Sequence, residues 1–282
     1  MYQLRPPAPQ LSAFIEHYWF VDASDGPVDL RVDVYVDGRA DLVFNFGAPY
    51  ERAVIGGAVS RMGSSNLDAQ RTDPIRITQR GVVHTAGVRF RLGGLGPFTV
   101  GPLAPWTNLT PAPSAVLPPS IEELEGALAA EPSLDAAATA LDAWFLQALQ
   151  VDDGRRAFER ALHLLVQSNG AASVATAARA AGASVRHLER LFARQLGIGP
   201  KATARIIRFQ AALRSLMRDP DRPLADVGAA AGYFDQAHFI RDFRRMTGGL
   251  PRGYRGYYPP DGPSDFAPNV VVFVQSGEAR ER

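Results

Sequence analysis

The chain has 282 residues, 46% of them hydrophobic, and a formal net charge of +1. It contains no cysteine, which excludes disulfide bridges, thiolate metal sites and cysteine nucleophiles. No run approaches the roughly 18 apolar residues of a membrane span, and the N-terminal MYQLRPPAPQ lacks the charged-then-apolar layout of a signal peptide. We therefore expect a cytoplasmic protein of two domains with no membrane partner.

The near-neutral total conceals two oppositely charged parts. Residues 1–154 carry 10 arginines and 18 acidic residues, a net charge of −8. Residues 155–257 carry 18 basic and 7 acidic residues, a net charge of +11. A segment this basic is expected to attract a polyanion, whereas the acidic part is not.

Alternating apolar residues indicate strands in the first part of the chain. Two alternating runs within 30–46 flank Asp37-Gly38, a pair typical of tight turns, and so predict a β-hairpin. Another alternating run, 82–90, ends at the turn-rich segment 93–97. Repeated strand signals separated by glycine and proline predict a β-sandwich or barrel across residues 1–115.

Helical periodicity replaces this alternation further along. Residues 111–119 are proline-rich and predict a linker. Apolar residues share one face in 121–128 and again in 134–145, which predicts two helices within a helical linker, 116–154. A third amphipathic stretch, 158–166, predicts the helix that completes a three-helix core with the segment after it.

One stretch of sequence occurs twice, at 177–200 and at 227–251. Each copy predicts an alanine-rich helix, a glycine turn at Gly182 or Gly232, and a second helix with an arginine stripe. The matching pairs are Leu188 and Phe239, Arg190 and Arg241, Phe192 and Phe243, and Arg194 and Arg245. Each copy is typical of a helix-turn-helix unit that binds DNA, so the sequence predicts two such units.

The second helix of each copy carries side chains suited to a duplex. Ser184 and Asp235 are predicted to cap these helices. A guanidinium matches O6 and N7 of guanine or two phosphate oxygens, and glutamine pairs with adenine. Residues early in this helix are expected to enter the major groove, and later residues to lie near the phosphate backbone. For each single residue, a base edge and a phosphate remain alternative contacts. The candidate DNA-contacting residues are Ser184, Arg186, His187, Glu189, Arg190, Arg194, Gln236, His238, Arg241, Arg244 and Arg245.

A helix predicted over 200–217 would fix the separation of the two copies. Helices that enter successive major grooves on one face of a duplex must lie roughly 34 Å apart. One chain is therefore expected to cover two adjacent groove segments.

Residues 155–257 resemble the DNA-binding domain of AraC/XylS-type bacterial transcription regulators. The motif G-x-S-x-x-x-L-x-R-x-F begins at Gly182, and the stretch 226–255 is similar to the family's signature around the second unit. The resemblance implies promoter binding with Arg190 and Arg241 facing the groove. Gly228 departs from the family, which usually has a bulkier or helix-favouring residue there, and glycine weakens a helix by roughly 1 kcal/mol.

The N-terminal part resembles sensor-like domains found ahead of some of these regulators, which look like cupin-type effector barrels. The resemblance rests on FIEHYWF (14–20), DGRADLVFNFG (37–47) and GVRFRLGG (87–94), and it implies no particular ligand. His17, Trp19, Phe44 and Arg89 are the candidate ligand-binding residues. Packing is the alternative role of Trp19, and pairing with a structural carboxylate such as Asp41 is the alternative role of Arg89.

The sequence thus predicts an α+β protein of two domains. A cupin-like β-barrel or sandwich (1–115) and a helical linker (116–154) precede an all-α double helix-turn-helix domain (155–257) and a tail (258–282), in which 269–275 suggests a short strand. We expect a homodimeric transcription regulator that binds double-stranded promoter or operator DNA and responds to a small-molecule effector. The segment 120–150 or a barrel edge would form the dimer, and the alternative function is an effector-free DNA-binding or interaction protein.

Enzymatic function is not expected. A metal-dependent cupin needs a histidine and glutamate cluster, but His17 and His84 are the only histidines before His163 and do not form a close pair in sequence. A DNA-alkylation repair protein would need an acceptor cysteine, which the chain lacks. We accordingly expect no metal and no other cofactor.

Overall fold

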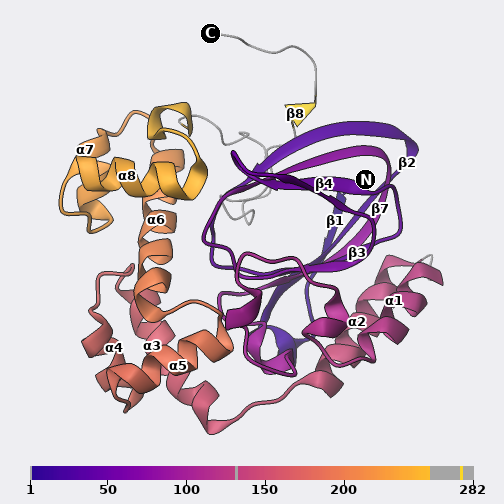
Figure 1. The fold of residues 1–282 in the computed structure, drawn as a ribbon, viewed down its shortest axis with the longest axis horizontal. Helices are drawn as coiled ribbons and strands as arrows, with labels where there is room; N and C mark the ends of the chain where they lie inside the picture. The colour runs from indigo at the N-terminus through magenta and orange to yellow at the C-terminus, as the bar shows by residue number, and fades with distance from the viewer. Residues whose placement is uncertain (1, 131–132, 255–273, 276–282) are drawn as a thin grey trace.

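The structure is a computed structural model that describes residues 2–130, 133–254 and 274–275 (Figure 1). It consists of an antiparallel β-sheet domain followed by a helical region, as the sequence predicts. None of the helices in these ranges is long and apolar enough to span a membrane.

The sheet is built around two long strands, β2 (Ile15–Val34) and β7 (Ile75–Phe90), and curves strongly in Figure 1. Its order is β1-β2-β7-β3-β6, while β4 pairs with β7 and β5. The remaining strands are β1 (Tyr2–Arg5), β3 (Asp41–Asn45), β4 (Tyr50–Val54), β5 (Val59–Met62), β6 (Asn66–Asp68) and β8 (Val274–Gln275). The short strand suggested at 269–275 is described only at β8, which pairs with Leu30 and Arg31 of β2.

The hairpin predicted over 30–46 is wrong, although both of its strands form. β2 and β3 pair with β7 on its two sides rather than with each other, because the long β7 offers each of them an antiparallel partner. The connection between them does not make a two-residue turn but reaches the helical region. Val36 on this connection is fully buried there, among the residues of the helical core.

Residues 116–154 do not behave as a linker. The helices α1 (Ile121–Ala130) and α2 (Leu134–Ala148) share one buried cluster with the sheet, and Phe145 packs edge-on against Phe98 with ring centroids 4.9 Å apart. The proline-rich segment before them is packed as well, since Leu67 N–H donates to the Pro111 carbonyl at 2.9 Å and Val116 is 2% exposed. The direct connection to the next helix is therefore only 149–152.

Short 3-10 turns shape the loops of this domain. They are η1 (Pro9–Leu11), η2 (Gly96–Phe98), η3 (Ala104–Trp106) and η4 (Pro113–Ala115), and η5 (Pro251–Tyr254) follows the last helix. Each has proline at one of its first positions, where the fixed backbone angle and the missing N–H are tolerated.

The helical region contains two helix-turn-helix units joined by one long helix. The elements are α3 (Asp153–Gln167), α4 (Val174–Ala181), α5 (Val185–Gln195), α6 (Pro200–Arg218), α7 (Leu224–Ala230) and α8 (Gln236–Thr247). Aromatic pairs close each unit, with Phe158 and Phe192 at 4.8 Å in the first and Phe209 and Phe243 at 5.5 Å in the second. Residues 255–257, the end of the predicted domain, lie outside the described ranges.

The sheet domain holds the last turns of α5 and α8. Leu103 N–H donates to the Arg194 carbonyl at 3.0 Å, and Val36 N–H donates to the Met246 carbonyl at 3.3 Å. The Gln210 side chain of α6 also donates to the Val36 carbonyl at 2.7 Å. The two parts of the chain are thus joined by specific hydrogen bonds as well as by the connection 149–152.

Candidate nucleic-acid interface

The helix α5, called here the first reader helix, begins at a capping serine. The Ser184 hydroxyl accepts the His187 N–H at 3.2 Å, as the sequence predicts. Leu188 and Phe192 are fully buried and fix one face of the helix. The opposite face is exposed and holds every candidate residue of this copy. These residues are Ser184, Arg186, His187, Glu189, Arg190 and Arg194.

Two ion or hydrogen-bond contacts orient side chains on this face. Arg190 Nη2 lies 3.1 Å from His187 Nδ1, so these neighbouring side chains are held together. Arg194 Nη2 lies 4.0 Å from Asp152 Oδ2, and both side chains are more than half exposed, so this ion pair is weak. Neither contact withdraws an arginine from solvent.

The helix α8, the second reader helix, repeats this design. The Asp235 carboxylate accepts the His238 N–H at 2.6 Å, and Phe239 and Phe243 are fully buried. Four candidates of this copy are exposed: Gln236, Arg241, Arg244 and Arg245. His238 is half-buried, edge-on to the Tyr233 ring at 5.1 Å, with Nε2 3.9 Å from Asp242 Oδ2.

Glycines in the left-handed region occur at matching places in the two copies. Gly182 has φ +66° and Gly232 has φ +81° in the turns, and Gly197 with φ +90° and Gly248 with φ +79° follow the reader helices. Side chains rarely adopt this backbone conformation, so glycine is needed there. The glycines that the sequence repeat pairs thus occupy equivalent structural positions in the two helix-turn-helix units.

The two reader helices lie at opposite ends of α6 (Figure 1). With its 19 residues and a rise of roughly 1.5 Å per residue, α6 is about 28 Å long. Pro200 begins it, as predicted, and a continuous buried face through Ile206, Phe209 and Leu213 ties it to both units. The helix α6 therefore holds the two units at a fixed separation.

Phe234, which lies in the turn directly before the Asp235 cap, was not among the candidate residues predicted from the sequence. Its side chain is 93% exposed, whereas the neighbouring Tyr233 is 5% exposed. The available signal was an aromatic residue at the position between a turn glycine and a helix cap, where polar residues are usual.

Three of the four candidate effector residues, Phe44, Trp19 and Arg89, are packed or paired within the described part of the sheet domain. Phe44 is fully buried in the sheet core, and the Trp19 indole lies so close to Gly87 that a Cβ there would clash with it. Arg89 donates to Asp41 at 2.7 Å and also pairs with Asp37, which is the structural-carboxylate role. Burial, aided by Arg89, lowers the pKa of the half-buried His17 to about 4.

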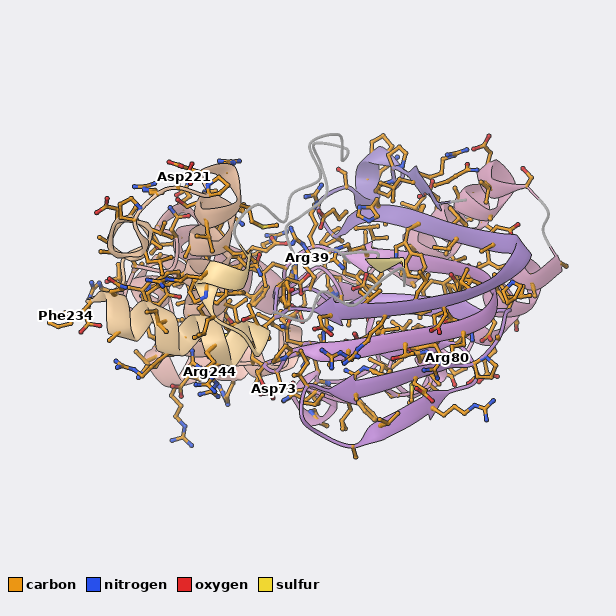
Figure 2. All side chains as sticks on the ribbon, turned by 90° about the horizontal axis from the view of Figure 1, so that it is seen from above. Arg39, Asp73, Arg80, Asp221, Phe234 and Arg244 are labelled. Carbon is orange, nitrogen blue, oxygen red and sulfur yellow. The ribbon has the colours of Figure 1, made fainter. Side chains whose placement is uncertain are left out.

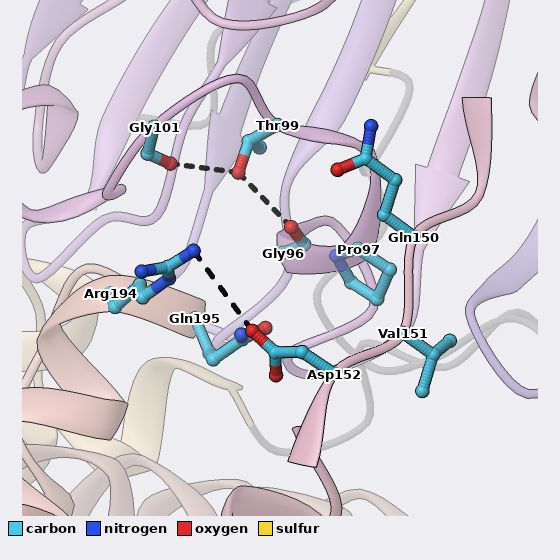
Figure 3. Close-up of a pocket in the computed structure, with 9 residues that line it drawn as sticks. All are labelled: Gly96, Pro97, Thr99, Gly101, Gln150, Val151, Asp152, Arg194 and Gln195. Carbon is cyan, nitrogen blue, oxygen red and sulfur yellow. Dashed lines mark hydrogen bonds and ion pairs between the residues drawn. The ribbon is translucent and has the colours of Figure 1, made fainter. Parts of the chain in front are cut away.

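A cavity of about 250 Å³ lies where the sheet domain, the connection 149–152 and the end of α5 meet (Figure 3). The Gln195 side chain is 6% exposed there and its Oε1 has no hydrogen-bond partner. Arg194 and Asp152 form the ion pair at the cavity edge. The lining residues are Gly96, Pro97, Thr99, Gly101, Gln150, Val151, Asp152, Arg194 and Gln195. None of them was predicted to bind an effector, and Arg194 was predicted to contact DNA.

The fold and this surface define a double helix-turn-helix domain placed behind an antiparallel sheet domain. A sequence family described as "Helix-turn-helix domain" matches residues 177–257. A second family, described as "Domain of unknown function (DUF6597)", matches residues 3–111. Residues 177–257 of the chain therefore match a helix-turn-helix family, in agreement with the two units that the structure shows there.

Similar proteins include the HTH-type transcriptional regulator GlxA of Rhizobium meliloti (strain 1021), which is 38% identical over 78 residues. That match covers 28% of this chain and spans about a quarter (24%) of the relative's length. The crystal structure of ToxT from Vibrio cholerae O395 has a TM-score of 0.44 and 11% identity, covering 81% of this chain and 95% of that one. An unsaturated fatty acid-bound ToxT from Vibrio cholerae strain SCE256 has a TM-score of 0.42 and 10% identity, covering 83% and 96%.

Proposed function

We propose that this protein is a sequence-specific transcription regulator whose two reader helices enter successive major grooves of promoter or operator DNA. The observation that carries the proposal is the shared burial register of α5 and α8. In both helices the aromatic or leucine positions are buried while the matched arginines, Arg190 with Arg241 and Arg194 with Arg245, are exposed. A solvated charge stripe without function would not require the same register, turn glycines and caps twice.

Position along each reader helix assigns the roles. Arg186, His187 and Arg190 would meet base edges, and Gln236 with Arg241 would do so in the second copy. Ala237 stands where the first copy has Arg186, so the second helix reads fewer bases by hydrogen bonding. Arg194, Arg244 and Arg245 lie in the last turns and would contact phosphate, with Ser184, Glu189 and His238 orienting their neighbours.

The test is a gel-shift on a duplex selected from a randomised library, comparing the wild-type protein with the double variant Arg190→Ala, Arg241→Ala. Each lost guanine contact costs about 1–3 kcal/mol, so we expect a loss of affinity of at least tenfold. The charge-matched control is Arg31→Ala, Arg80→Ala, which removes two exposed arginines of the sheet domain. Equal retention of the wild type and the first variant at several salt concentrations would contradict the proposal.

We further propose that a small molecule modulates this activity from the cavity at the domain junction. The cavity is lined by the last residues of α5, so a bound ligand would act directly on the first reader helix. A ligand that binds only the folded protein raises its melting temperature by mass action. Thermal unfolding across a metabolite panel should therefore find a stabilising compound that loses its effect in Gln195→Leu.

The alternative is an effector-free DNA-binding or interaction protein. The packing of Phe44 and Trp19 and the pairing of Arg89 favour it, because these side chains are committed within the fold. Absence of any thermal shift across a broad panel, together with intact DNA binding, would support this alternative.

A homodimer remains part of the proposal, with the sheet edge as the contacting surface. The apolar faces of α1 and α2 are buried against the sheet, so they do not offer a dimer contact. In the described sheet β5 pairs only with β4 and carries Val59 at 64% exposure. Sedimentation at micromolar concentration is expected to show a dimer that Val59→Lys weakens, and a monomer throughout would contradict it.

A further inference from the structure

Phe234 is an exposed aromatic residue in the turn that precedes α8. At 93% exposure it far exceeds the other exposed large hydrophobic side chains of the described residues, of which Val59 and Val100 reach 64%. Figure 2 shows it projecting from the helical region at the end away from the sheet domain. It buries very little of its surface, so the stability of the fold does not explain it.

The backbone on both sides of Phe234 is fixed. The Tyr233 ring lies 5.1 Å from the His238 ring and 5.3 Å from the Phe239 ring, and Arg208 lies over its face at 5.6 Å. On the other side Asp235 caps α8. The phenyl ring is therefore presented at a defined place, at low entropic cost for binding.

This place is the N-terminal entrance of the second reader helix, the end that reaches base edges in helix-turn-helix proteins. A phenyl ring offers no hydrogen bond, and the apolar group that the major groove exposes is the C5-methyl of thymine. The exposed arginines of the same helix, Arg241 and Arg244, would draw a duplex to α8.

A protein partner fits the surroundings less well. Binding sites for proteins gather apolar side chains into a patch. In the described part of the second helix-turn-helix unit, the other exposed large hydrophobic is Leu250 at 55%, which lies beyond the opposite end of α8. A solitary exposed ring at the start of a helix that carries exposed arginines matches a nucleic acid.

We propose that Phe234 contacts a thymine methyl group at the edge of the second half-site and sets a thymine preference there. This inference rests on the proposed DNA-binding function and names a specificity residue within it. It also supplies the base contact that the second reader helix lacks at Ala237.

The test uses the full chain and a duplex selected from a random library by the wild-type protein. Each thymine of the second half-site is replaced in turn by deoxyuridine, which removes only the methyl group. A buried methyl is worth about a fourfold change in affinity, so we expect the wild type to lose about that much at one position. Phe234→Ala should bind more weakly and show no loss at that position.

Leu250→Ala is the matched control, since it removes an exposed apolar side chain from the same unit and should leave the deoxyuridine profile unchanged. If the wild type selects no sequence, the proposed function itself fails. If it selects one and Phe234→Ala retains the same affinity and profile, only the thymine contact is overturned. Unchanged DNA binding with lost transcriptional output in a reconstituted reaction would overturn it in favour of a protein partner.

Discussion

Arg89 lies buried in the sheet domain with its guanidinium against the carboxylates of Asp37 and Asp41. Burial alone would lower its pKa, but these two carboxylates and Glu16 raise it above the ordinary value, so Arg89 stays charged. Asp37 belongs to the connection that carries Val36 into the helical core. The buried ion cluster therefore holds in place the segment through which the two domains meet.

His17 gives a residue-scale prediction for the pH dependence of stability. Its folded-state pKa of about 4 lies below the ordinary value of 6.5, chiefly because burial disfavours the charged form. Because the folded-state pKa is lowered, the unfolded state binds a proton more readily than the folded state. The contribution of neutral His17 to the free energy of unfolding is therefore present above pH 6.5 and is lost as the pH falls through 4. We expect the free energy of unfolding to fall by about 1–2 kcal/mol over this pH range, a value reduced to allow for the partial exposure of the ring.

Urea unfolding of the wild type and His17→Gln between neutral pH and about pH 4 measures this contribution. The free energy of unfolding should fall more steeply for the wild type than for the variant. His163→Gln, which changes an exposed histidine, is the control and should follow the wild type. Parallel curves for the wild type and His17→Gln would contradict the prediction.

Among the elements, two helical glycines have opposite surroundings. Gly126 of α1 is exposed and an added Cβ would meet nothing within 4 Å, whereas a Cβ on Gly228 of α7 would lie 3.1 Å from the Phe239 Cβ. Close packing of α7 on α8 thus explains why glycine stands where the resemblance leads one to expect a larger residue. The helix propensity lost there is offset by a closer helix contact.

We expect Gly126→Ala to raise the free energy of unfolding by about 0.5–1 kcal/mol through helix propensity. Gly228→Ala should gain nothing, since the crowding against Phe239 opposes the same propensity gain. Thermal or urea unfolding of the two variants provides the comparison. Equal stabilisation by both would show that α7 and α8 are less closely packed than described.

The elements also show where sequence information was sufficient. The caps at Ser184 and Asp235 and the turn glycines were predictable, because these features act over a few neighbouring residues. The alternation of apolar residues in 30–46 correctly predicted two strands but not their pairing partners. An alternating strand can pair with any other strand of the same pattern, and both of these strands pair with β7. The packing of α1 and α2 on the sheet depends on long-range contacts that an amphipathic pattern does not specify.

The exposed face that carries the candidate DNA-contacting residues was more predictable than the cavity proposed for an effector, for the same reason. Reader residues follow from helical spacing after a recognisable turn, and every one of them lies on the face expected or at its edge. The cavity at the domain junction joins residues from 96–101, 150–152 and 194–195, which no local pattern connects. Phe234 lies in the turn of the second copy, where polar residues are usual. An aromatic residue at this position was the signal that could have marked it as a candidate contact.

On the scale of the whole molecule, Val36 belongs to the sheet domain by sequence and to the helical core by packing. Truncating a fully buried valine costs about 2 kcal/mol through lost contacts and a residual cavity. We expect Val36→Ala to speed amide hydrogen exchange in α6 and α8, although neither helix is changed. The control Val54→Ala, 37% exposed at the end of β4, should have little effect.

Exchange rates in α6 and α8 that stay the same in Val36→Ala would mean that the sheet domain does not stabilise the DNA-binding region. The expected result would instead show that the two parts unfold as a coupled unit. It would also give the sheet domain a direct physical route to the reader helices, because the Val36 N–H holds the last turn of α8.

On the scale of the whole molecule, the proposed function requires that α5 and α8 bind one duplex at the same time, at a separation fixed by α6. The most direct measurement is the affinity of the wild-type protein for its selected duplex with base pairs inserted between the two half-sites. An insertion of about 5 base pairs turns the second site to the opposite face, and one of about 10 restores the face but not the distance. We predict at least a tenfold loss of affinity for both insertions; equal affinity at all three spacings would contradict the simultaneous grip.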